Sequence, residues 1–467
     1  MQEDGEASSE FELPVDEEHR ATELCLLSAA GPHMRAFHLA WFSLFACFFS
    51  AFAAPPLLPV LRLHLGLSSL DISHAGVASV SGTIFARFAM GSACDLLGPR
   101  VASVALALLT APAIYAFAAF SSSSSAFLLL RFVAGLSLAN FVANQYWMSS
   151  MFAPRVVGRA NGISAGWANA GSGAAQFLMP LAYAALLRLS GSPSFAWRAA
   201  FLIPATLQVI TALAVLAFGQ DLPDGNIASV RKQELKLNNP RPSIWVVLRE
   251  GLGNYRGWVL ALTYGYCYGV ELAMENVVAE YFYGRFGLEL QTAGMVAACF
   301  GMANVVSRPA GGVLSDELGS RFGMRGRLWG LWAVQTTGGL FCVLLGRMKS
   351  LPAAGAVMCG FAFFAQAASG LTFGVVPFVS KRSLGVISGM TGSGGALGAV
   401  VTQLLFFSGN KYSTETGISL MGVMILACTL PIASIYFPEW GGMFCGPSKC
   451  PPLSEDIDAG GEYHLLK

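Results

Sequence analysis

The amino-acid sequence predicts an all-α membrane protein in which twelve transmembrane helices form two pseudo-symmetric six-helix bundles. Three observations support this prediction: an apolar composition, twelve long apolar segments, and a charged repeat that recurs in both halves of the chain. Hydrophobic residues make up 54% of the 467 residues and charged residues only 12%, whereas soluble domains carry about 25% charged residues. The composition indicates a chain that lies mainly in lipid, and it excludes a disordered protein.

Charge, cysteine usage and motifs exclude several classes of function. The net charge is +1, so no basic field favours nucleic acid as a partner. None of the ten cysteines belongs to a Cys-x-x-Cys pair, which argues against a zinc site and a disulfide framework. The sequence also shows no nucleophile–base constellation, phosphate-binding glycine loop or metal-ligand cluster. We therefore predict no enzymatic activity and no cofactor.

Twelve apolar segments account for most of the chain. Nearly all are long enough to cross about 30 Å of hydrocarbon as helices, and they lack the alternating polarity of barrel strands. Their approximate limits are 37–61, 73–96, 101–121, 124–152, 158–189, 198–219, 257–284, 292–317, 325–346, 352–380, 384–408 and 415–437.

Polar segments divide the chain into five parts. The longest internal polar break, 220–256, separates a first six-helix bundle, 37–219, from a second, 257–437. Six spans on each side of such a break are typical of internally duplicated transporters. The flanking segments, 1–36 and 438–467, are polar, and the first lacks the basic start and short apolar core of a signal peptide.

Basic residues in the loops predict the orientation of the chain. The loops on the side of both termini carry about twice as many lysines and arginines as the opposite loops. Since basic loops stay in the cytoplasm, we expect both termini and the central loop to be cytoplasmic.

A charged repeat occurs at the same place in each half. Residues 87–100 read RFAMGSACDLLGPR and residues 308–321 read RPAGGVLSDELGSR, and both fit Arg-x3-Gly-x3-Asp-x2-Gly-x-Arg. Its later charged residues lie where a span meets its cytoplasmic loop: Asp95, Arg100, Asp316 and Arg321. We expect carboxylate and guanidinium groups to pair there across neighbouring helices and to act as gating latches, with the repeat glycines forming the turns.

Arg87 and Arg308 begin the two copies, eight residues before the aspartates. At 1.5 Å per residue, this spacing places them roughly 12 Å from the cytoplasmic ends, close to the bilayer centre. An arginine there costs at least about 2.5–3.5 kcal/mol. Two planar, permanently charged forks suit a small oxyanion held between the halves. The alternative is a pair of structural ion bridges to carboxylates in the membrane.

Two glycine-rich segments also recur in the two halves, 158–176 (GRANGISAGWANAGSGAAQ) and 385–398 (GVISGMTGSGGALG). Small residues let helices approach closely and slide, and by themselves such faces are often packing features.

The stretches GWANAG and GSGGALG resemble the two nitrate-signature segments of the nitrate/nitrite porter branch of the major facilitator superfamily. Further segments resemble plant high-affinity nitrate transporters over almost the whole chain, among them FELPVDEEHRATE, PHMRAFHLAWFSLF, SLANFVANQYWMSSMF and LTFGVVPFVSKRSLG. The resemblance implies the major facilitator fold, proton-coupled import of nitrate across the plasma membrane, and a small single-span accessory protein as partner.

The resemblance also implies roles for individual residues. Arg87 and Arg308 match the substrate arginines of the family, and Asn169 matches its signature asparagine. Tyr146 lies in QYWMS of the fourth span and Trp167 in the signature itself, where aromatic rings can sandwich a flat anion. For these two rings, packing against lipid or the core is the alternative.

The chain departs from the family pattern at two positions. Ala168 stands where the family usually has glycine, and Ala396 stands where it usually has asparagine. The second change removes a hydrogen-bond donor, so affinity and the preference between nitrate and nitrite stay open.

The seventh span, 257–284, carries three acidic residues that suit proton coupling. Import of an anion against an inside-negative potential costs about 2.3 kcal/mol per 100 mV, so concentrative uptake needs a co-transported cation. Glu271 lies near the centre of the span, Glu275 one turn further on the same face, and Glu280 nearer the outer end. A carboxyl group whose surroundings alternate can load and release a proton. The alternative for Glu271 is that it only neutralises an arginine.

Two other functions remain open at this point. A nitrate/nitrite exchanger would need no proton-carrying carboxyl group in the seventh span. A nitrate sensor, which binds without sustained flux, would share the same binding residues.

Overall fold

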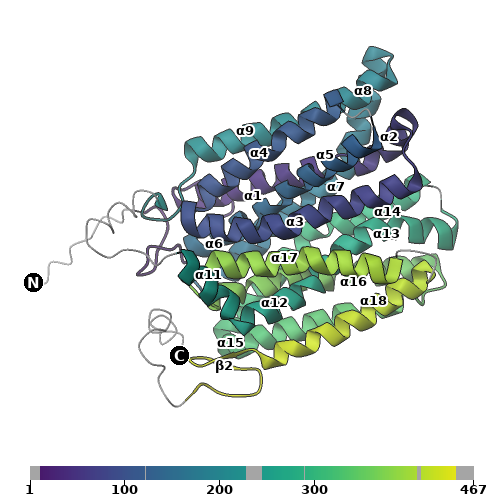
Figure 1. Cartoon of the computed structure of the whole chain (residues 1–467). Helices are drawn as coiled ribbons and strands as arrows, with labels where there is room; N and C mark the ends of the chain where they lie inside the picture. Colours follow the sequence, from purple (N-terminus) through teal and green to yellow (C-terminus); the bar gives the residue numbers. More distant parts are fainter. Residues whose placement is uncertain (1–10, 121–122, 228–243, 289, 408–411, 449–467) are drawn as a thin grey trace, which may run out of the picture.

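The protein is a bundle of long helices that lie side by side (Figure 1). The computed structural model describes residues 11–120, 123–227, 244–288, 290–407 and 412–448. Within this part of the chain, the strands are confined to an antiparallel hairpin of β1 Tyr436–Phe437 and β2 Gly441–Gly442. The predicted all-helical fold class is confirmed.

The first half of the chain supplies the helices drawn in purple to blue-green in Figure 1. They are α1 His33–Ala51, η1 Pro55–Leu57, α2 Leu58–Leu65, α3 Ser69–Leu97, α4 Pro99–Phe120, α5 Ser124–Leu136, η2 Ser137–Ala139, α6 Asn140–Met151, α7 Val157–Ser190, α8 Pro193–Ala200 and α9 Leu202–Phe218.

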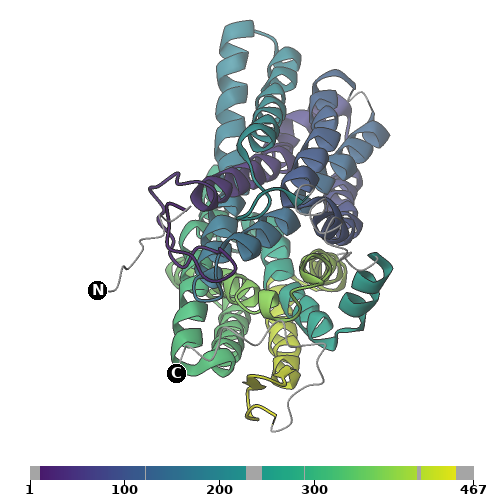
Figure 2. The same ribbon diagram turned by 90° about the vertical axis from the view of Figure 1, so that its left-hand side faces the viewer.

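The second half supplies the green to yellow helices, and Figure 2 shows the two halves as separate groups, one above the other. They are α11 Ile244–Gly253, α12 Tyr255–Gly265, α13 Tyr268–Phe286, α14 Leu290–Met302, α15 Asn304–Leu345, α16 Leu351–Phe373, η3 Val376–Phe378, α17 Leu384–Thr402, η4 Gln403–Phe407, α18 Thr414–Thr429 and η5 Leu430–Ser434.

Ten helices among the described residues are long and apolar enough to cross a membrane, whereas twelve apolar segments are predicted. The seventh segment, 257–284, is divided between α12 and α13, because the helix breaks at Tyr266 and Cys267. The eighth and ninth segments count together as one span, Ala298–Leu345, although the non-helical backbone at Gly323 separates them. The difference therefore lies in where helices break, and the apolar segments themselves are all helical over most of their length.

The helix α3 shows how local chemistry sets the ends of an element that carries a predicted site residue. It begins at a capping box. The Ser68 hydroxyl accepts a hydrogen bond from the Asp71 backbone amide, and the Asp71 carboxylate accepts one from the Ser68 backbone amide. It ends at Gly98, whose φ of 89° is easily reached by glycine. In the second copy of the repeat, Gly319 stays helical, because the chain turns only at Gly323 with a φ of 62°. The expected turn at Gly319 is therefore wrong by four residues.

Two glycine-lined interfaces join the halves: α3 packs along α17, and α7 packs along α15. A Cβ atom placed on Gly389 would lie 2.9 Å from the Arg87 carbonyl oxygen, and one on Gly162 would lie 2.8 Å from the Arg308 carbonyl oxygen. Only glycine leaves room for such backbone contact. The glycine-rich segments thus bring the two arginine-bearing helices against the opposite half.

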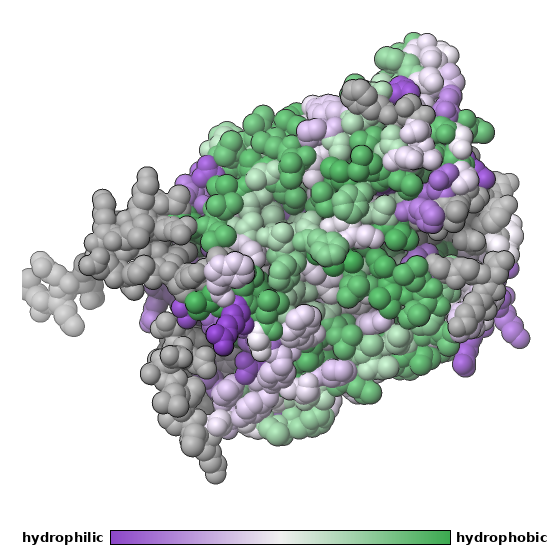
Figure 3. Space-filling view, in the orientation of Figure 1, coloured by the Kyte–Doolittle hydropathy of each residue, from purple (hydrophilic) through white to green (hydrophobic). Residues whose placement is uncertain are grey.

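One end of the bundle holds the two repeat aspartates and the starts of α7 and α17, and we call it the terminal end. The segment before α1 lies there, since the Ala21 amide donates to the Met151 carbonyl and the Ala153 amide donates to the Ala21 carbonyl. The β1–β2 hairpin lies at the same end (Figure 1). In Figure 3, hydrophobic residues cover the middle of the visible face and hydrophilic residues gather toward its ends, as expected for a chain that spans a bilayer.

We expect Gly312→Ala to destabilise the protein. A Cβ atom at Gly312 would overlap the Gly158 carbonyl oxygen across the α7–α15 interface, and overpacking of this kind costs about 1–3 kcal/mol. The melting temperature of the purified protein should fall. Gly355→Ala in α16 is the matched control, because nothing lies within 4 Å of its added methyl group. Equal melting temperatures for the two variants would contradict the close approach.

Candidate functional site

Arg87 of α3 and Arg308 of α15 lie at the interface between the halves, and they are among the most deeply buried side chains in the protein. Their exposed fractions are 0% and 1%. The guanidinium carbon of Arg87 lies 4.9 Å from the ring centroid of Tyr268, and that of Arg308 lies 5.0 Å from the same centroid. The structure therefore brings the two arginines of the repeat close to one aromatic side chain.

Aromatic rings from both halves enclose the pair. The Tyr268 ring lies nearly parallel to Phe141 of α6 and to Tyr264 of α12, at interplanar angles of 10° and 19°. Phe373 of α16 meets Phe141 and Tyr264 edge-on, with both centroid distances at 5.1 Å. Arg87 also lies 5.2 Å from the Phe141 centroid. These rings offer flat faces to the cations and shield them from water.

Arg87 reaches across the interface to the second half. Its Nη1 donates to the Gly392 carbonyl oxygen of α17 at 2.8 Å, and its Nη2 donates to the Tyr268 hydroxyl at 3.0 Å. Its Nε has no hydrogen-bond partner, and no carboxylate pairs with Arg87, among the residues that the structure describes. Among the described residues, the hydrogen-bond partners of the Arg87 guanidinium are therefore neutral groups.

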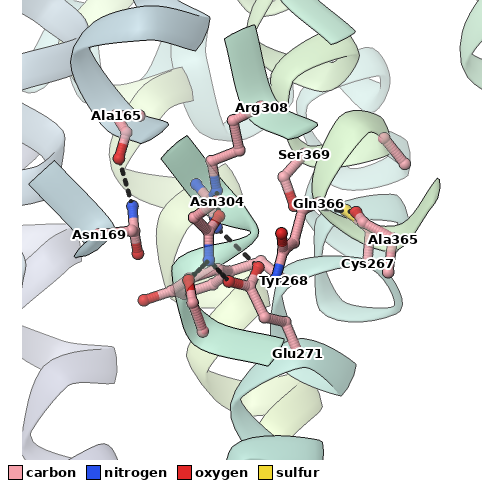
Figure 4. A network of polar contacts seen from close by, with 12 residues as sticks. Ala165, Asn169, Cys267, Tyr268, Glu271, Asn304, Arg308, Ala365, Gln366 and Ser369 are labelled. Carbon is pink, nitrogen blue, oxygen red and sulfur yellow. Dashed lines mark hydrogen bonds and ion pairs between the residues drawn. The ribbon is translucent and has the colours of Figure 1, made fainter. Parts of the chain in front are cut away.

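Arg308 has a different environment, which Figure 4 shows. Its Nη2 pairs with Glu271 Oε2 at 2.8 Å, and its Nε donates to Asn304 Oδ1 at 2.6 Å. The Asn304 amide in turn donates to Glu271 Oε1, which closes a three-membered cycle. With both arginines and Glu271 charged, this cluster carries a formal charge of +1, which one monovalent anion would balance.

Asn169 is the third predicted substrate residue, and it lies in the same region. It projects from α7 beside the Arg308–Asn304–Glu271 cluster (Figure 4) and is buried. Its Nδ2 donates to the Ala165 carbonyl of its own helix at 2.7 Å.

The two predicted aromatic residues lie elsewhere. The Trp167 ring packs against Trp41 and Phe37 of α1, at centroid distances of 5.5 and 6.2 Å. Tyr146 packs into a cluster with Met90 and Cys94 of α3. The structure thus lays other rings, namely Phe141, Tyr264 and Tyr268, against the arginines, and the sequence reasoning missed them. The sequence did contain a signal: Tyr264 and Tyr268 are four residues apart, and Tyr268 precedes Glu271 by three, so the three side chains can share one helix face.

The predicted acidic residues follow one another along α13. Glu271 belongs to the arginine cluster, as described above. Glu275 lies one turn further on, where Ser172 of α7 hydrogen-bonds to its carboxylate and Gly301 of α14 lies close to it. The side chain of Glu280 lies outside the described residues.

The repeat aspartates hold the halves together at the terminal end. Asp95 accepts the backbone amides of Gly385 and Val386, both at 3.1 Å, at the start of α17. Asp316 accepts the amides of Gly158 and Arg159, at 3.0 and 2.7 Å, at the start of α7. Each carboxylate therefore binds the positive end of a helix dipole in the opposite half.

The basic residues of the repeat take other partners than expected. Arg100 donates to the Leu216 carbonyl at 2.8 Å, and its backbone amide donates to Asp221. Burial raises the pKa of the Asp221 carboxyl, against the opposing effect of this hydrogen bond. Arg321 forms an ion pair with Glu317 of its own helix.

Arg327 instead pairs with Asp316 at 3.0 Å, and it also donates to Pro154 in the first half. The sequence reasoning missed Arg327 because it lies outside the repeat, beyond the turn at Gly323.

Comparisons with known proteins agree with this architecture. Residues 40–403 match the Major Facilitator Superfamily. The chain is 60% identical over 440 residues to "High-affinity nitrate transporter 2.3" of Oryza sativa subsp. japonica, covering 94% of this chain and 84% of that protein. It is 57% identical over 450 residues to "High affinity nitrate transporter 2.5" of Arabidopsis thaliana, covering 96% and 89%.

Two solved structures share the fold at low sequence identity. The human organic anion transporter MFSD10 gives a TM-score of 0.59 at 15% identity, covering 86% of this chain and 99% of that one. The proton:xylose symporter XylE gives a TM-score of 0.60 at 13% identity, covering 86% and 95%.

We expect the Arg308–Glu271 pair to show strong energetic coupling. Glu271→Gln and Arg308→Gln should each destabilise the protein by about 3–5 kcal/mol, because each leaves one buried charge without its partner. The double variant should melt above both single variants. The partly exposed pair of Arg285 and Glu415 is the control, where an exposed pair contributes about 0–1 kcal/mol. Additive effects at Arg308 and Glu271 would contradict a coupled pair.

Proposed function

Because the chain belongs to the major facilitator superfamily and, within it, to the family of plant high-affinity nitrate transporters, we propose that it imports nitrate by proton-coupled alternating access. The observation that carries the proposal is the meeting of two buried guanidinium groups, one from each half, beside Tyr268. A site shared by two halves can face either side of the membrane as the halves rock.

Nitrate would bridge Arg87 and Arg308. Planar guanidinium groups donate parallel hydrogen bonds to the oxygens of a planar anion. Arg87 has its Nε free of hydrogen-bond partners among the described residues, so it can contribute donors without losing an ion pair. We propose Asn169 as a further contact, and we propose that Phe141 and Tyr268 enclose the flat anion in the role first expected of Tyr146 and Trp167.

Proton coupling would act through the partner of Arg308. While Glu271 is ionised, it occupies the guanidinium donors that nitrate needs. Protonation of Glu271 would release those donors, and nitrate would then take the place of the carboxylate. Glu275 and Glu280 follow along the same helix, and we propose that they pass protons toward Glu271. Such an exchange of ligands links one proton to nitrate binding at the site itself. A net inward current requires at least one further proton per nitrate, and we propose that Glu275 or Glu280 carries it.

The terminal end would be the cytoplasmic gate. Asp95 and Asp316 must release the starts of α17 and α7 before the halves can part there. We propose that Arg100 and Arg321 re-pair during this opening. The excess of basic residues in these loops supports a cytoplasmic location for both termini. We propose residence in the plasma membrane from the resemblance to plant high-affinity nitrate transporters. We further propose that transport activity needs a small single-span accessory protein.

We expect Arg87→Lys and Arg308→Lys each to abolish most nitrate uptake. Lysine keeps the charge but lacks the planar fork, and each charged hydrogen bond lost is worth about 1.5–3 kcal/mol, or roughly 10- to 100-fold in affinity. The measurement is nitrate-evoked current in oocytes that express the accessory protein, normalised to surface abundance. Arg347→Lys, at an exposed position, should behave as the wild type. Normal uptake by Arg87→Lys or Arg308→Lys would overturn the assignment of that arginine as a nitrate ligand. Nitrate binding without current in the wild type would instead favour a nitrate sensor.

We expect nitrate-evoked inward current to grow as the external solution is acidified, and Glu271→Gln to lose this dependence. A glutamine cannot take up a proton, so external pH would no longer control access of nitrate to Arg308. The experiment compares currents at an acidic and a neutral external pH. Glu250→Gln is the control, because Glu250 is exposed at the terminal end. An unchanged pH response in Glu271→Gln would remove this residue from the proton path, and pH-independent flux in the wild type would favour an exchanger.

A further inference from the structure

The short helix α11 packs one face onto the start of α17. The Ser383 hydroxyl donates to the Val247 carbonyl oxygen at 3.1 Å. A Cβ atom on Gly251 would lie 2.6 Å from Cγ1 of Val386, which shows how closely the two helices approach. Val247 and Gly251 lie four residues apart and form the buried face of α11.

The opposite face of α11 is apolar and exposed. Trp245, Val246 and Leu252 expose 76%, 47% and 38% of their surface, and Arg249 is exposed between them. Trp245 and Arg249 are four residues apart and therefore share a face. Exposed apolar residues that gather on one helix face indicate an interaction surface.

The position of α11 indicates what covers this face. Only Asn254 separates α11 from α12, with which the seventh predicted span begins. At the start of α12, Tyr255 and Trp258 expose 46% and 57% of their surface. Tyrosine and tryptophan gather at the level of lipid headgroups. The exposed face of α11 continues this aromatic surface, which places α11 at the edge of the bilayer.

The charge of this region favours one kind of lipid. Arg249 and Arg382 are both exposed. Glu250, the acidic residue of α11, lies 3.7 Å from Arg382 and offsets part of that charge, which leaves Arg249 as the cation on the apolar face. An amphipathic helix with tryptophan and leucine beside arginine binds anionic membrane surfaces.

We propose that α11 is a docking site for anionic phospholipid, with Trp245 and Leu252 in the boundary of the acyl chains and Arg249 on a headgroup phosphate. The site adjoins the gate, because α11 holds the first turn of α17, whose Gly385 and Val386 amides bind Asp95. Docked lipid would therefore fix the position of a gating helix. Lipid binding at α11 can be measured in the absence of nitrate.

The test uses the full-length chain in nanodiscs of phosphatidylcholine alone and of phosphatidylcholine with an equal amount of phosphatidylglycerol. Hydrogen exchange of the amides in 244–254 should slow in the anionic discs. Native mass spectrometry of protein released from them should detect retained phosphatidylglycerol. The double variant Trp245→Ser with Arg249→Gln should lose both effects. Arg155→Gln, at an exposed arginine of the loop before α7, should keep both.

Three outcomes would overturn the proposal. Equal protection of α11 in the two kinds of disc would make it an apolar anchor without charge recognition. Retention of phosphatidylglycerol by the double variant at the level of the wild type would place the lipid elsewhere. Loss of retention in Arg155→Gln would assign the effect to the general charge of this end of the protein.

Discussion

The burial of two guanidinium groups at the middle of the bundle is the constraint on which the rest of the structure depends. A charge held away from water is costly unless polar groups surround it. The second half supplies most of these groups for both arginines: Glu271, Asn304 and Tyr264 for Arg308, and the Gly392 carbonyl and Tyr268 for Arg87. Among the described residues, the hydrogen bonds that the Arg87 guanidinium makes therefore come from the second half, and this favours a close interface with polar groups at its centre.

The arginine site and the proposed gate share two helices. Arg87 and Asp95 lie on α3, and Arg308 and Asp316 lie on α15, in both cases eight residues or roughly 12 Å apart. The carbonyl of each arginine meets a glycine of the opposite half, and each aspartate binds the start of the same opposing helix. A small rotation of either helix at its arginine would therefore also move its aspartate. In the transport cycle that we propose, filling the site and opening the terminal end would be two consequences of one rigid-body movement.

The sequence repeat correctly predicted where the charged residues lie along their helices. It did not predict which aromatic and basic side chains contact them, because those contacts depend on the direction of each side chain. The positions of Arg87, Arg308, Asp95 and Asp316 follow from a fixed spacing on a helix, and the structure shows them near the interface as a pattern of charge predicts. By contrast, 12% of the residues are aromatic, so composition alone could not say that Tyr268 faces the arginines while Trp167 faces α1. The partners of Asp316 include Arg327, which folds back from beyond Gly323, and no local pattern reports such a return.

The two halves differ in the partners of their buried arginines. The repeat makes Arg87 and Arg308 equivalent, but only Arg308 has a carboxylate partner within the described residues. Two equivalent arginines with neutral partners would hold an anion and would respond little to protons. One arginine with a carboxylate partner would make the same site sensitive to proton binding, because in the proposed mechanism nitrate and Glu271 compete for Nη2 of Arg308. In the proposed mechanism, proton coupling would thus arise from the loss of symmetry at one position, while the symmetric parts would provide the gate.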